Sequence, residues 1–284
     1  MNFVLITLDN HVTGSVDRAA RQLADQAPGL NVRVHAAADW NGEGDALARC
    51  RADIASGDII VVTMLFLEDQ ITAILPDLQA RRDHCDAMIC AMSGAEIVKL
   101  TRMGRFTMDG EAKGPVALLK RLRGKNGKAK SSAGAQQLTV LRQLPKILRF
   151  IPGTAQDVRA YFLTLQYWLA GSDENLQRMM GFLIDRYADG PRAALRGQLK
   201  THSPIEYPDV GLYDPGLKRG ISDDLKDLPR APKGCRGTVG ILIMRSYALA
   251  GNAGHYDAVI NALRERGLRV ITAFASGLDA RPAV

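Results

Sequence analysis

Residues 245–256 hold side chains that could bind an anion and move a proton. Arg245 and Ser246 open this segment, and His255 and Tyr256 close it. A guanidinium group pairs well with a carboxylate, and an imidazole gains or loses a proton near neutral pH. The segment lies between a predicted strand and a predicted helix, and backbone N–H groups at the start of a helix attract anions. Two interpretations stay open: the four residues bind a substrate, or His255 and Tyr256 only begin the helix.

A second group of candidates follows the apolar runs of the first hundred residues, where a cleft could form. Ligands of open α/β sheets bind beyond the carboxyl ends of the strands. Acid, imidazole and hydroxyl groups stand at three such ends: Asp9, His11, Glu68, Asp69, Ser93 and Glu96. Helix capping is the alternative interpretation, because carboxylates favour the first turn of a helix and Ser93 with Glu96 has the spacing of a capping box.

The elements that must position these candidates alternate between strands and helices. Short apolar or alternating runs predict strands at residues 3–8, 31–36, 59–63 and 87–91. Helical periodicity fills the intervals, most clearly between Ile71 and Leu78. This order, with short connections, predicts a flavodoxin-like α/β fold, a doubly wound parallel sheet with helices on both faces.

The later sequence divides into a helical segment, a connector and a second α/β unit. Two helices with apolar faces are predicted to end at Gly171 and Tyr187, and a strand–helix–strand pattern runs from Thr238 to Ala275. Two strands and one helix cannot cover their own apolar faces, so we expect a fragment of a longer protein or a unit completed by a partner. The predicted parts are an α/β head domain, a basic linker with helices, an extended connector and the truncated start of a further domain: residues 1–110, 111–190, 191–236 and 237–284.

Positive charge is concentrated in one segment of the chain. The net charge is +7, yet residues 113–150 contain ten Lys or Arg and no Asp or Glu. Binding to nucleic acid is not expected, because the segment lacks interleaved aromatic residues and any known reading module. The amphipathic piece from Leu118 to Leu122 could make weak peripheral contact with an anionic membrane. A docking surface for an acidic partner is the favoured interpretation.

Several classes of protein and site are not expected from this sequence. No apolar run approaches the roughly 18 residues of a membrane span, and residues 1–9 resemble a buried strand more than a signal peptide, so we expect a cytoplasmic protein. Gly127 and Lys128 lack the glycine spacing of a phosphate-binding loop, so this chain is not expected to bind ATP. None of the four cysteines forms a C-x₂-C pair, and no metal site is expected. Cys50 and Cys90 are expected to be buried thiols.

Eight segments, spread over the chain in order, form one recognisable set. They are Met64–Asp69, Asp86–Met88, Ser93–Phe106, Lys146–Tyr161, Tyr167–Ser172, Tyr207–Pro208, Gly211–Pro215 and Arg245–Tyr256. Together they resemble the large, porphyrin-binding (H-type) subunit of magnesium chelatase, in the form found in bacteria that make bacteriochlorophyll. No single segment is specific alone, but the resemblance covers essentially the whole chain.

The resemblance implies an enzyme component that holds protoporphyrin IX and takes Mg²⁺ as a substrate, while two partner subunits of the AAA+ type bind and hydrolyse ATP. Members of that family are several times longer, so the resemblance places the catalytic residues outside this chain and leaves Arg245 and His255 at the rim of the cavity. Tyr247 stands where many members have histidine, so no catalytic role is carried over to it. Two alternatives stay open: the cobalt-inserting subunit of corrin synthesis, and a non-catalytic docking module for the ATPase subunits.

Overall fold

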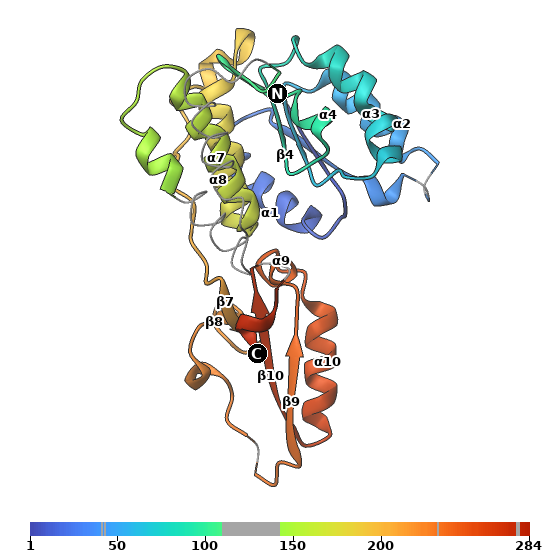
Figure 1. Ribbon diagram of the computed structural model, residues 1–284, viewed down its shortest axis with the longest axis vertical. Coiled ribbons are helices and arrows are strands. Elements are labelled where there is room, and N and C mark those ends of the chain that lie inside the picture. The colour runs from blue at the N-terminus through green and yellow to red at the C-terminus, as the bar shows by residue number, and fades with distance from the viewer. Residues whose placement is uncertain (41, 43, 110–142, 232, 277–278) are drawn as a thin grey trace, which may run out of the picture.

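Four parallel strands build the sheet that organises the first part of the chain. The computed structural model describes residues 1–40, 42, 44–109, 143–231, 233–276 and 279–284 (Figure 1). The sheet has the order β2-β1-β3-β4-β5-β6. Its strands are β1 (Asn2–Thr7), β2 (Asn31–Ala36), β3 (Ile59–Thr63), β4 (Ala87–Ala91), β5 (Arg102–Met103) and β6 (Phe106–Thr107). The α/β class is confirmed, and the order of the first four strands is that of the flavodoxin type. The short antiparallel pair β5 and β6, which extends the sheet beyond β4, was not predicted.

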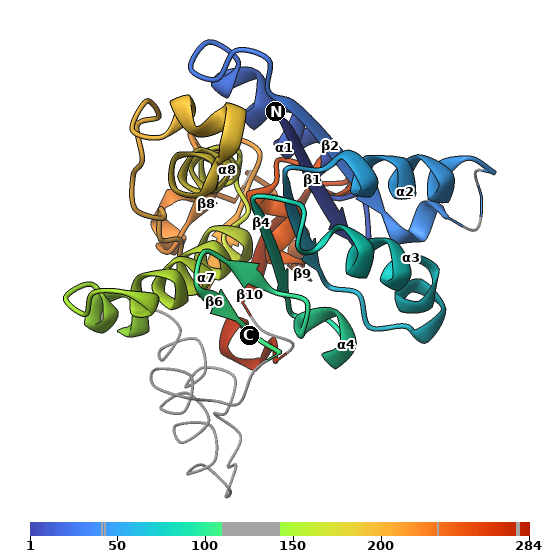
Figure 2. The ribbon, with the colours of Figure 1, turned by 90° about the horizontal axis from the view of Figure 1, so that it is seen from above.

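Helices cover both faces of this sheet, as Figure 2 shows. One face packs against α2 (Ala46–Ser56), α3 (Glu68–Arg81) and the short α4 (Ala95–Val98). The other face packs against α1 (Thr13–Leu23), α7 (Thr154–Leu169) and α8 (Asp173–Tyr187). Every residue of β3 and β4 is buried, because a parallel sheet between two helical layers has no face in water.

Helices α7 and α8 share a core with the first hundred residues. Val158 and Ile184 belong to the same buried cluster as Leu5 and Ile89. Full burial of one such side chain stabilises the fold by roughly 1.5–3 kcal/mol, so these helices contribute strongly to the head sheet. The domain boundaries at 110, 190 and 236 stay predictions.

Local sequence explains where α8 begins and how it is held. Ser172 is its N-cap and accepts a hydrogen bond from the backbone N–H of Asn175 at 3.3 Å, as capping by a hydroxyl requires. Asp173, in the first turn, accepts hydrogen bonds from Arg18 of α1 at 2.5 and 2.8 Å. This forked pair fixes α8 against α1, beside the second unit.

A buried carboxylate joins α7, α8 and the β5–β6 turn. Asp157 is 9% exposed. It accepts hydrogen bonds from Arg186 Nη2 at 2.9 Å, from the Tyr187 hydroxyl at 3.1 Å and from the Arg105 backbone N–H at 3.1 Å. Gly104 of the turn has φ +57°, and a Cβ there would lie 2.8 Å from Asp157 Oδ2. The close approach of the carboxylate therefore requires glycine at this position.

The second unit is a four-stranded sheet with the order β8-β7-β10-β9, drawn below the head in Figure 1. Its elements are β7 (Val210–Tyr213), β8 (Ile221–Ser222), β9 (Gly237–Leu242), α9 (Arg245–Leu249), α10 (Gly254–Glu265) and β10 (Leu268–Ala275). Strands β9 and β10 are parallel, and β7 runs antiparallel to β10. Its small core, centred on Ile260 and Phe274, lies between the sheet and α10.

Residues 191–236, predicted as an extended connector, hold short elements that the sequence analysis did not predict. That stretch contains β7, β8 and the 3-10 turn Leu225–Asp227, and the 3-10 turn Gly190–Leu195 precedes them. Strand β7 is short and gains its burial from pairing with β10, which lies some sixty residues later. Most of the basic segment, including the amphipathic piece from Leu118 to Leu122, lies outside the described residues, whereas its residues 143–148 are helical.

No helix in the described part of the chain combines the length and the apolar character needed to cross a membrane.

Candidate functional site at the junction of the two units

Two of the head candidates, Asp9 and His11, lie where the head contacts the candidate segment of the second unit. Asp9 and His11 follow β1, and α9 follows β9, so both segments lie at carboxyl ends of parallel strands. The His11 ring stacks on the Tyr247 ring, with centroids 5.1 Å apart and planes inclined by 24°. The sequence placed His11 and the segment 245–256 in separate candidate groups, and the fold brings them into contact.

Two further rings surround Tyr247. His255 and Tyr256, at the start of α10, present edges to the Tyr247 ring at 5.5 and 6.3 Å. The His255 and Tyr256 rings themselves lie 3.9 Å apart. The backbone N–H of Met244 donates to the Tyr256 hydroxyl at 3.2 Å, which fixes that ring against the end of β9. His255 is exposed, so its imidazole can meet a ligand or exchange a proton with water.

The charge of Asp9 affects the protons of two neighbouring side chains, His11 and Tyr247. Asp9 accepts hydrogen bonds from His11, through the ring Nδ1 and the backbone N–H. A carboxylate at Nδ1 holds the proton there and directs the other ring nitrogen outward. Burial, followed by the negative charge of Asp9, raises the pKa of Tyr247, so its hydroxyl keeps its proton at neutral pH. The cluster thus offers one fixed imidazole, one exposed imidazole and phenol donors.

One exposed apolar side chain stands beside the rings. Met244, which follows β9, is 57% exposed, and its backbone N–H bonds the Tyr256 hydroxyl. Leu242 is 52% exposed but alternates with Ile241, which packs toward α10, so Leu242 points to the opposite face of the sheet. The three aromatic rings with Met244 suit a flat, apolar ligand better than a small polar one.

Arg245 has a different position from the one expected of a ligand-binding arginine. Its guanidinium donates to the backbone carbonyls of Pro208 at 2.9 Å, Leu169 at 3.2 Å and Tyr207 at 3.3 Å. The hollow beside it has a volume of only about 60 Å³, which is far below the size of an ordinary ligand pocket. Arg245 therefore joins the second unit to the end of α7 and to the connector.

Head residues that the sequence did not single out hold the other side of the junction. Ser15 Oγ and Arg18 Nη2 donate to the Ala250 carbonyl at 2.7 and 3.0 Å. The Asn252 side chain donates to the His11 carbonyl at 3.3 Å. A buried serine on the apolar face of α1 was the one available signal, because a buried hydroxyl needs a partner. Ser246 lies half-buried within α9.

The remaining head candidates lie apart from this site. Glu68 and Asp69 are exposed in the first turn of α3, where their charges favour the helix dipole. Ser93 accepts from the Leu65 backbone N–H and donates to the Ala91 carbonyl, both at 3.1 Å, and so ties two loops together. It does not cap α4, whose N-cap is Gly94. Glu96 is exposed.

The described residues contain no group of three or more His, Cys, Asp and Glu side chains placed to hold a metal ion. The three cysteines of the head, Cys50, Cys85 and Cys90, are buried free thiols. Burial raises the pKa of Cys50 to about 12, so it is inert as a nucleophile or a ligand at neutral pH. Burial of Cys50 and Cys90 was predicted and is confirmed.

Comparison with known proteins relates the whole chain to one group. A family model described as a domain of unknown function (DUF3479) matches residues 2–162, and the CobN/Magnesium Chelatase model matches residues 165–284. The H subunit of the Cereibacter sphaeroides magnesium chelatase is 47% identical over 285 residues, and that of Rhodobacter capsulatus is 46% identical over 283 residues. Both alignments cover 100% of this chain and 23% of the relative.

More distant relatives extend the same pattern. The chloroplastic ChlH subunit of the Oryza sativa magnesium chelatase is 32% identical over 299 residues, covering 97% of this chain and 20% of the relative. Among solved structures, the catalytic subunit of a cobaltochelatase from Mycobacterium tuberculosis matches with a TM-score of 0.45 and 14% identity, over 99% of this chain and 17% of that chain. The chain spans about a quarter of the length of the two bacterial relatives.

Proposed function

This chain belongs to the family of magnesium-chelatase H subunits, and we propose that it forms the N-terminal part of the porphyrin-binding subunit of that enzyme. The reaction is the ATP-dependent insertion of Mg²⁺ into protoporphyrin IX during bacteriochlorophyll and chlorophyll synthesis, with Mg²⁺ as a substrate. The observation that carries the proposal is the alignment of the whole chain, in order, with a bacterial H subunit at 47% identity.

The junction supports a contact with the edge of the porphyrin. Protoporphyrin is flat and mostly apolar, and the rings of Tyr247 and Tyr256 with Met244 offer a surface of that character. Aromatic pairs contribute about 0.5–1.5 kcal/mol beyond the burial of their area. His255 is the exposed group on this surface that could exchange a proton with a pyrrole nitrogen. Arg245 supports the surface by holding α9 to the connector and to the end of α7.

The handling of the metal is assigned to parts of the H-type protein beyond this chain. Mg²⁺ prefers octahedral oxygen ligands and gives up its water reluctantly. Of the acids nearest the rings, Asp9 is engaged by His11, which leaves it poorly suited to bind a metal as well. Catalytic residues are accordingly proposed for the three quarters of the H-type protein that this chain does not span.

The partners follow from the same division. Two AAA+ subunits would bind ATP and couple its hydrolysis to insertion, since the sequence of this chain has no phosphate-binding loop. The cytoplasm is the proposed location. The cobalt-inserting alternative is not better supported, since the curated relatives named above are all magnesium-chelatase subunits.

A docking role is the second candidate function. Phe150 and Ile147 are 84% and 60% exposed, and they alternate with Lys146 and Arg149 at the end of the basic segment. Apolar groups beside positive charge suit an acidic partner protein. This role is compatible with porphyrin contact at the junction, because the two surfaces share no residue.

Titration of the chain with deuteroporphyrin, a soluble analogue of the substrate, tests porphyrin contact. We expect a saturable shift of the Soret band, and we expect Tyr247→Leu and His255→Ala each to weaken binding by about 5- to 10-fold, as the loss of one aromatic contact predicts. His202→Ala, which removes an exposed imidazole elsewhere, is the matched control and should bind normally. If the chain does not bind while the complete H-type protein does, porphyrin contact lies elsewhere and the docking role remains.

A further inference from the structure

Strand β2 is an open edge of the head sheet. It pairs with β1 on one side, and no further strand of the described chain lies on its other side. The Asn31 backbone N–H donates to the Met1 carbonyl at 2.8 Å, so by alternation the odd-numbered residues of β2 bond to β1. Val32, Val34 and Ala36 therefore turn their backbone N–H and C=O groups outward, and no described residue bonds to these groups. Such an edge is a template for another strand.

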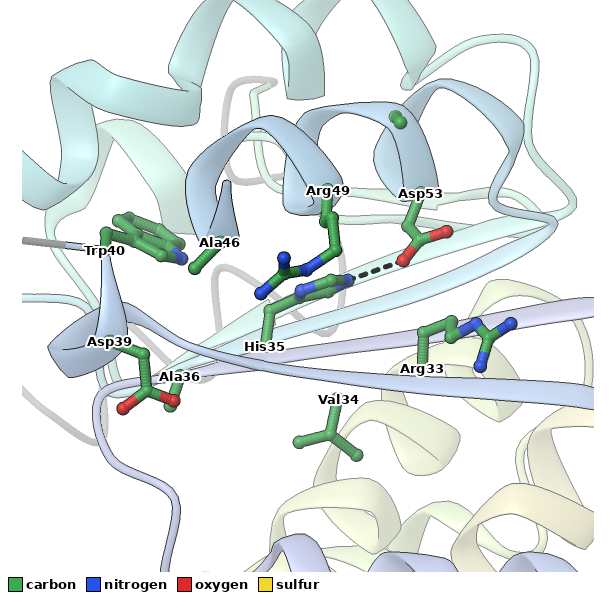
Figure 3. Close-up of a pocket in the computed structure, with 10 residues that line it drawn as sticks. Arg33, Val34, His35, Ala36, Asp39, Trp40, Ala46, Arg49 and Asp53 are labelled. Atoms are coloured by element: carbon green, nitrogen blue, oxygen red, sulfur yellow. Dashed lines mark hydrogen bonds and ion pairs between the residues drawn. The ribbon is translucent and has the colours of Figure 1, made fainter. Parts of the chain in front are cut away.

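A cavity of about 530 Å³ lies beside this edge, between β2, the 3-10 turn Ala37–Asp39 and α2 (Figure 3). Val34 lines the cavity although its side chain packs against the core on the opposite face of the sheet. The cavity therefore reaches the backbone of the edge strand. Ala46 and Ala52 of α2 line its other side. Their small side chains leave room for a side chain of an added strand.

The charges along β2 are complementary about its centre. Arg33 is exposed and forms no ion pair with another described residue. Two residues further on, His35 Nε2 lies 2.8 Å from Oδ2 of Asp53 in α2. Burial lowers the pKa of His35, so the ring is neutral at neutral pH and its Nε2–H donates to Asp53, which keeps its negative charge. A cation and an anion thus lie on one face of β2, on either side of Val34.

Pairing of two β2 strands about a two-fold axis through Val34 would bring these charges together. In an antiparallel pair centred there, Arg33 of one copy lies opposite His35 of the other, and opposite residues point to the same face of the sheet. Residues that exchange no hydrogen bonds have the closest side chains, so each Arg33 reaches the Asp53 carboxylate beside the facing His35. Symmetry makes this contact twice, and the apolar side chains on the other face of the two strands meet in the same way.

We propose that β2 is the contact surface for a second copy of this chain, and that two copies pair their β2 strands antiparallel to form one continuous sheet. About six main-chain hydrogen bonds join the strands, and Arg33 of each copy enters the cavity of the other and pairs with Asp53. An arginine on an edge strand ordinarily discourages pairing, but here the facing copy supplies both space and a carboxylate. A two-fold contact of this kind closes at the dimer. The surface shares no residue with the junction, so it does not depend on the proposed contact with porphyrin.

Sedimentation equilibrium of the chain tests for the dimer, and hydrogen exchange identifies its contact. We expect a reversible dimer at micromolar chain concentration. In residue-resolved exchange by NMR, the amides of Val32 and Val34 should be protected where the dimer forms and should exchange rapidly in the monomer. The amides of Arg33 and His35 bond to β1 in either state, so they should be protected in both and serve as internal controls.

Charge reversal tests the predicted pairing of side chains. Arg33→Glu places a carboxylate beside Asp53 at both contacts of the dimer, and Asp53→Lys places an ammonium group beside Arg33 at both. Each change should weaken self-association by at least about tenfold, because like charges in contact repel. An equimolar mixture of the two variants should form a heterodimer close to the strength of the parent dimer, because both of its contacts join opposite charges. Arg219→Glu, an equal reversal at an exposed site of the second unit, should dimerise like the parent.

Three results would overturn the proposal. One is a chain that stays monomeric up to millimolar concentration. The second is a dimer in which the amides of Val32 and Val34 exchange as fast as in the monomer, since the contact would then lie elsewhere. The third is a mixture of Arg33→Glu and Asp53→Lys that associates no better than either variant alone, with both shown to be folded by circular dichroism. If Asp53→Lys does not fold, hydrogen exchange of the parent protein decides. None of these results bears on the titration with deuteroporphyrin, which reads the junction.

Discussion

Replacement of Arg245 by methionine tests whether this residue holds the two units together. Methionine is also a long, flexible side chain, but it cannot donate hydrogen bonds. The change removes three charge-assisted bonds, at 2.9, 3.2 and 3.3 Å, to carbonyls of the connector and of α7. A hydrogen bond to a charged group contributes about 1.5–3 kcal/mol when buried. The side chain is half-buried and the Leu169 bond is exposed, so we discount the sum to about 2–3 kcal/mol.

The predicted loss should appear first as opening of the junction. A change of about 2–3 kcal/mol multiplies the open population by about 30- to 140-fold, so limited proteolysis should cut the connector before β7 faster by that factor. Thermal unfolding should shift by about 4–12 °C, at 2–4 °C for each kcal/mol in a chain of this size. Arg245→Lys should recover only part of the loss, because an ammonium group lacks the planar fork that reaches several carbonyls.

Arg219→Met is the matched control for charge and size, since Arg219 is exposed in the second unit. Our reasoning is refuted if Arg245→Met and this control have the same melting temperature and the same cleavage rate. If Arg245→Met instead keeps full protection but loses deuteroporphyrin binding, the arginine acts on the ligand and the interpretation from the sequence was the better one.

Three further predictions concern the head. Gly104→Ala should lower the free energy of unfolding in urea by about 2–3 kcal/mol, because it combines positive φ with a clash against Asp157. Gly29→Ala is the control, since Gly29 has φ +77° in open space, and it should cost only about 1 kcal/mol. Equal losses in the two variants would contradict the clash. Burial lowers the pKa of His35, so the unfolded chain binds more protons below its own pKa of about 6.5. Stability should therefore fall as the pH drops below about 6.5. Between pH 5 and 7, the urea midpoint of His35→Gln should depend less on pH than that of the parent protein. If the midpoints of the two proteins change equally with pH, protonation of His35 is not the cause. Of the four cysteines, only Cys235 is not buried. A chromogenic disulfide reagent should therefore react with one thiol in the native protein and with four in urea. Rapid reaction of a second thiol in the native protein would show that the head core opens.

The boundaries of several strands could be predicted because their signal is local. β2, β3 and β4 begin and end at the residues expected from apolar runs and alternation, and β10 ends at Ala275 as expected. By contrast, β7 has four residues, one of them Gly211, whose missing side chain makes room for the ring of Phe274. No window of sequence around β7 contains the partner that buries it. Elements that depend on distant pairing were therefore the ones missed.

The candidate site divides in the same way. The residue types after β1 and β9 could be chosen from the sequence, since carboxyl ends of parallel strands are where ligands bind. The contact between His11 and Tyr247 joins positions 236 residues apart, and nothing local encodes it. The partners of Arg245 are backbone carbonyls. Every residue has one, so residue types cannot predict which carbonyl an arginine will contact. The charge of Arg245 therefore indicated an anion as its partner, whereas the fold supplies neutral oxygen atoms.

The position of the ring cluster is thus set by contacts that lie behind it. Ser15 and Arg18 hold the Ala250 carbonyl from the head, and Arg245 holds the connector from the second unit. These bonds fix the backbone on both sides of Tyr247, so His11 and Tyr247 stack without either ring donating a hydrogen bond to the other. A surface positioned by backbone contacts can change its side chains without losing its shape.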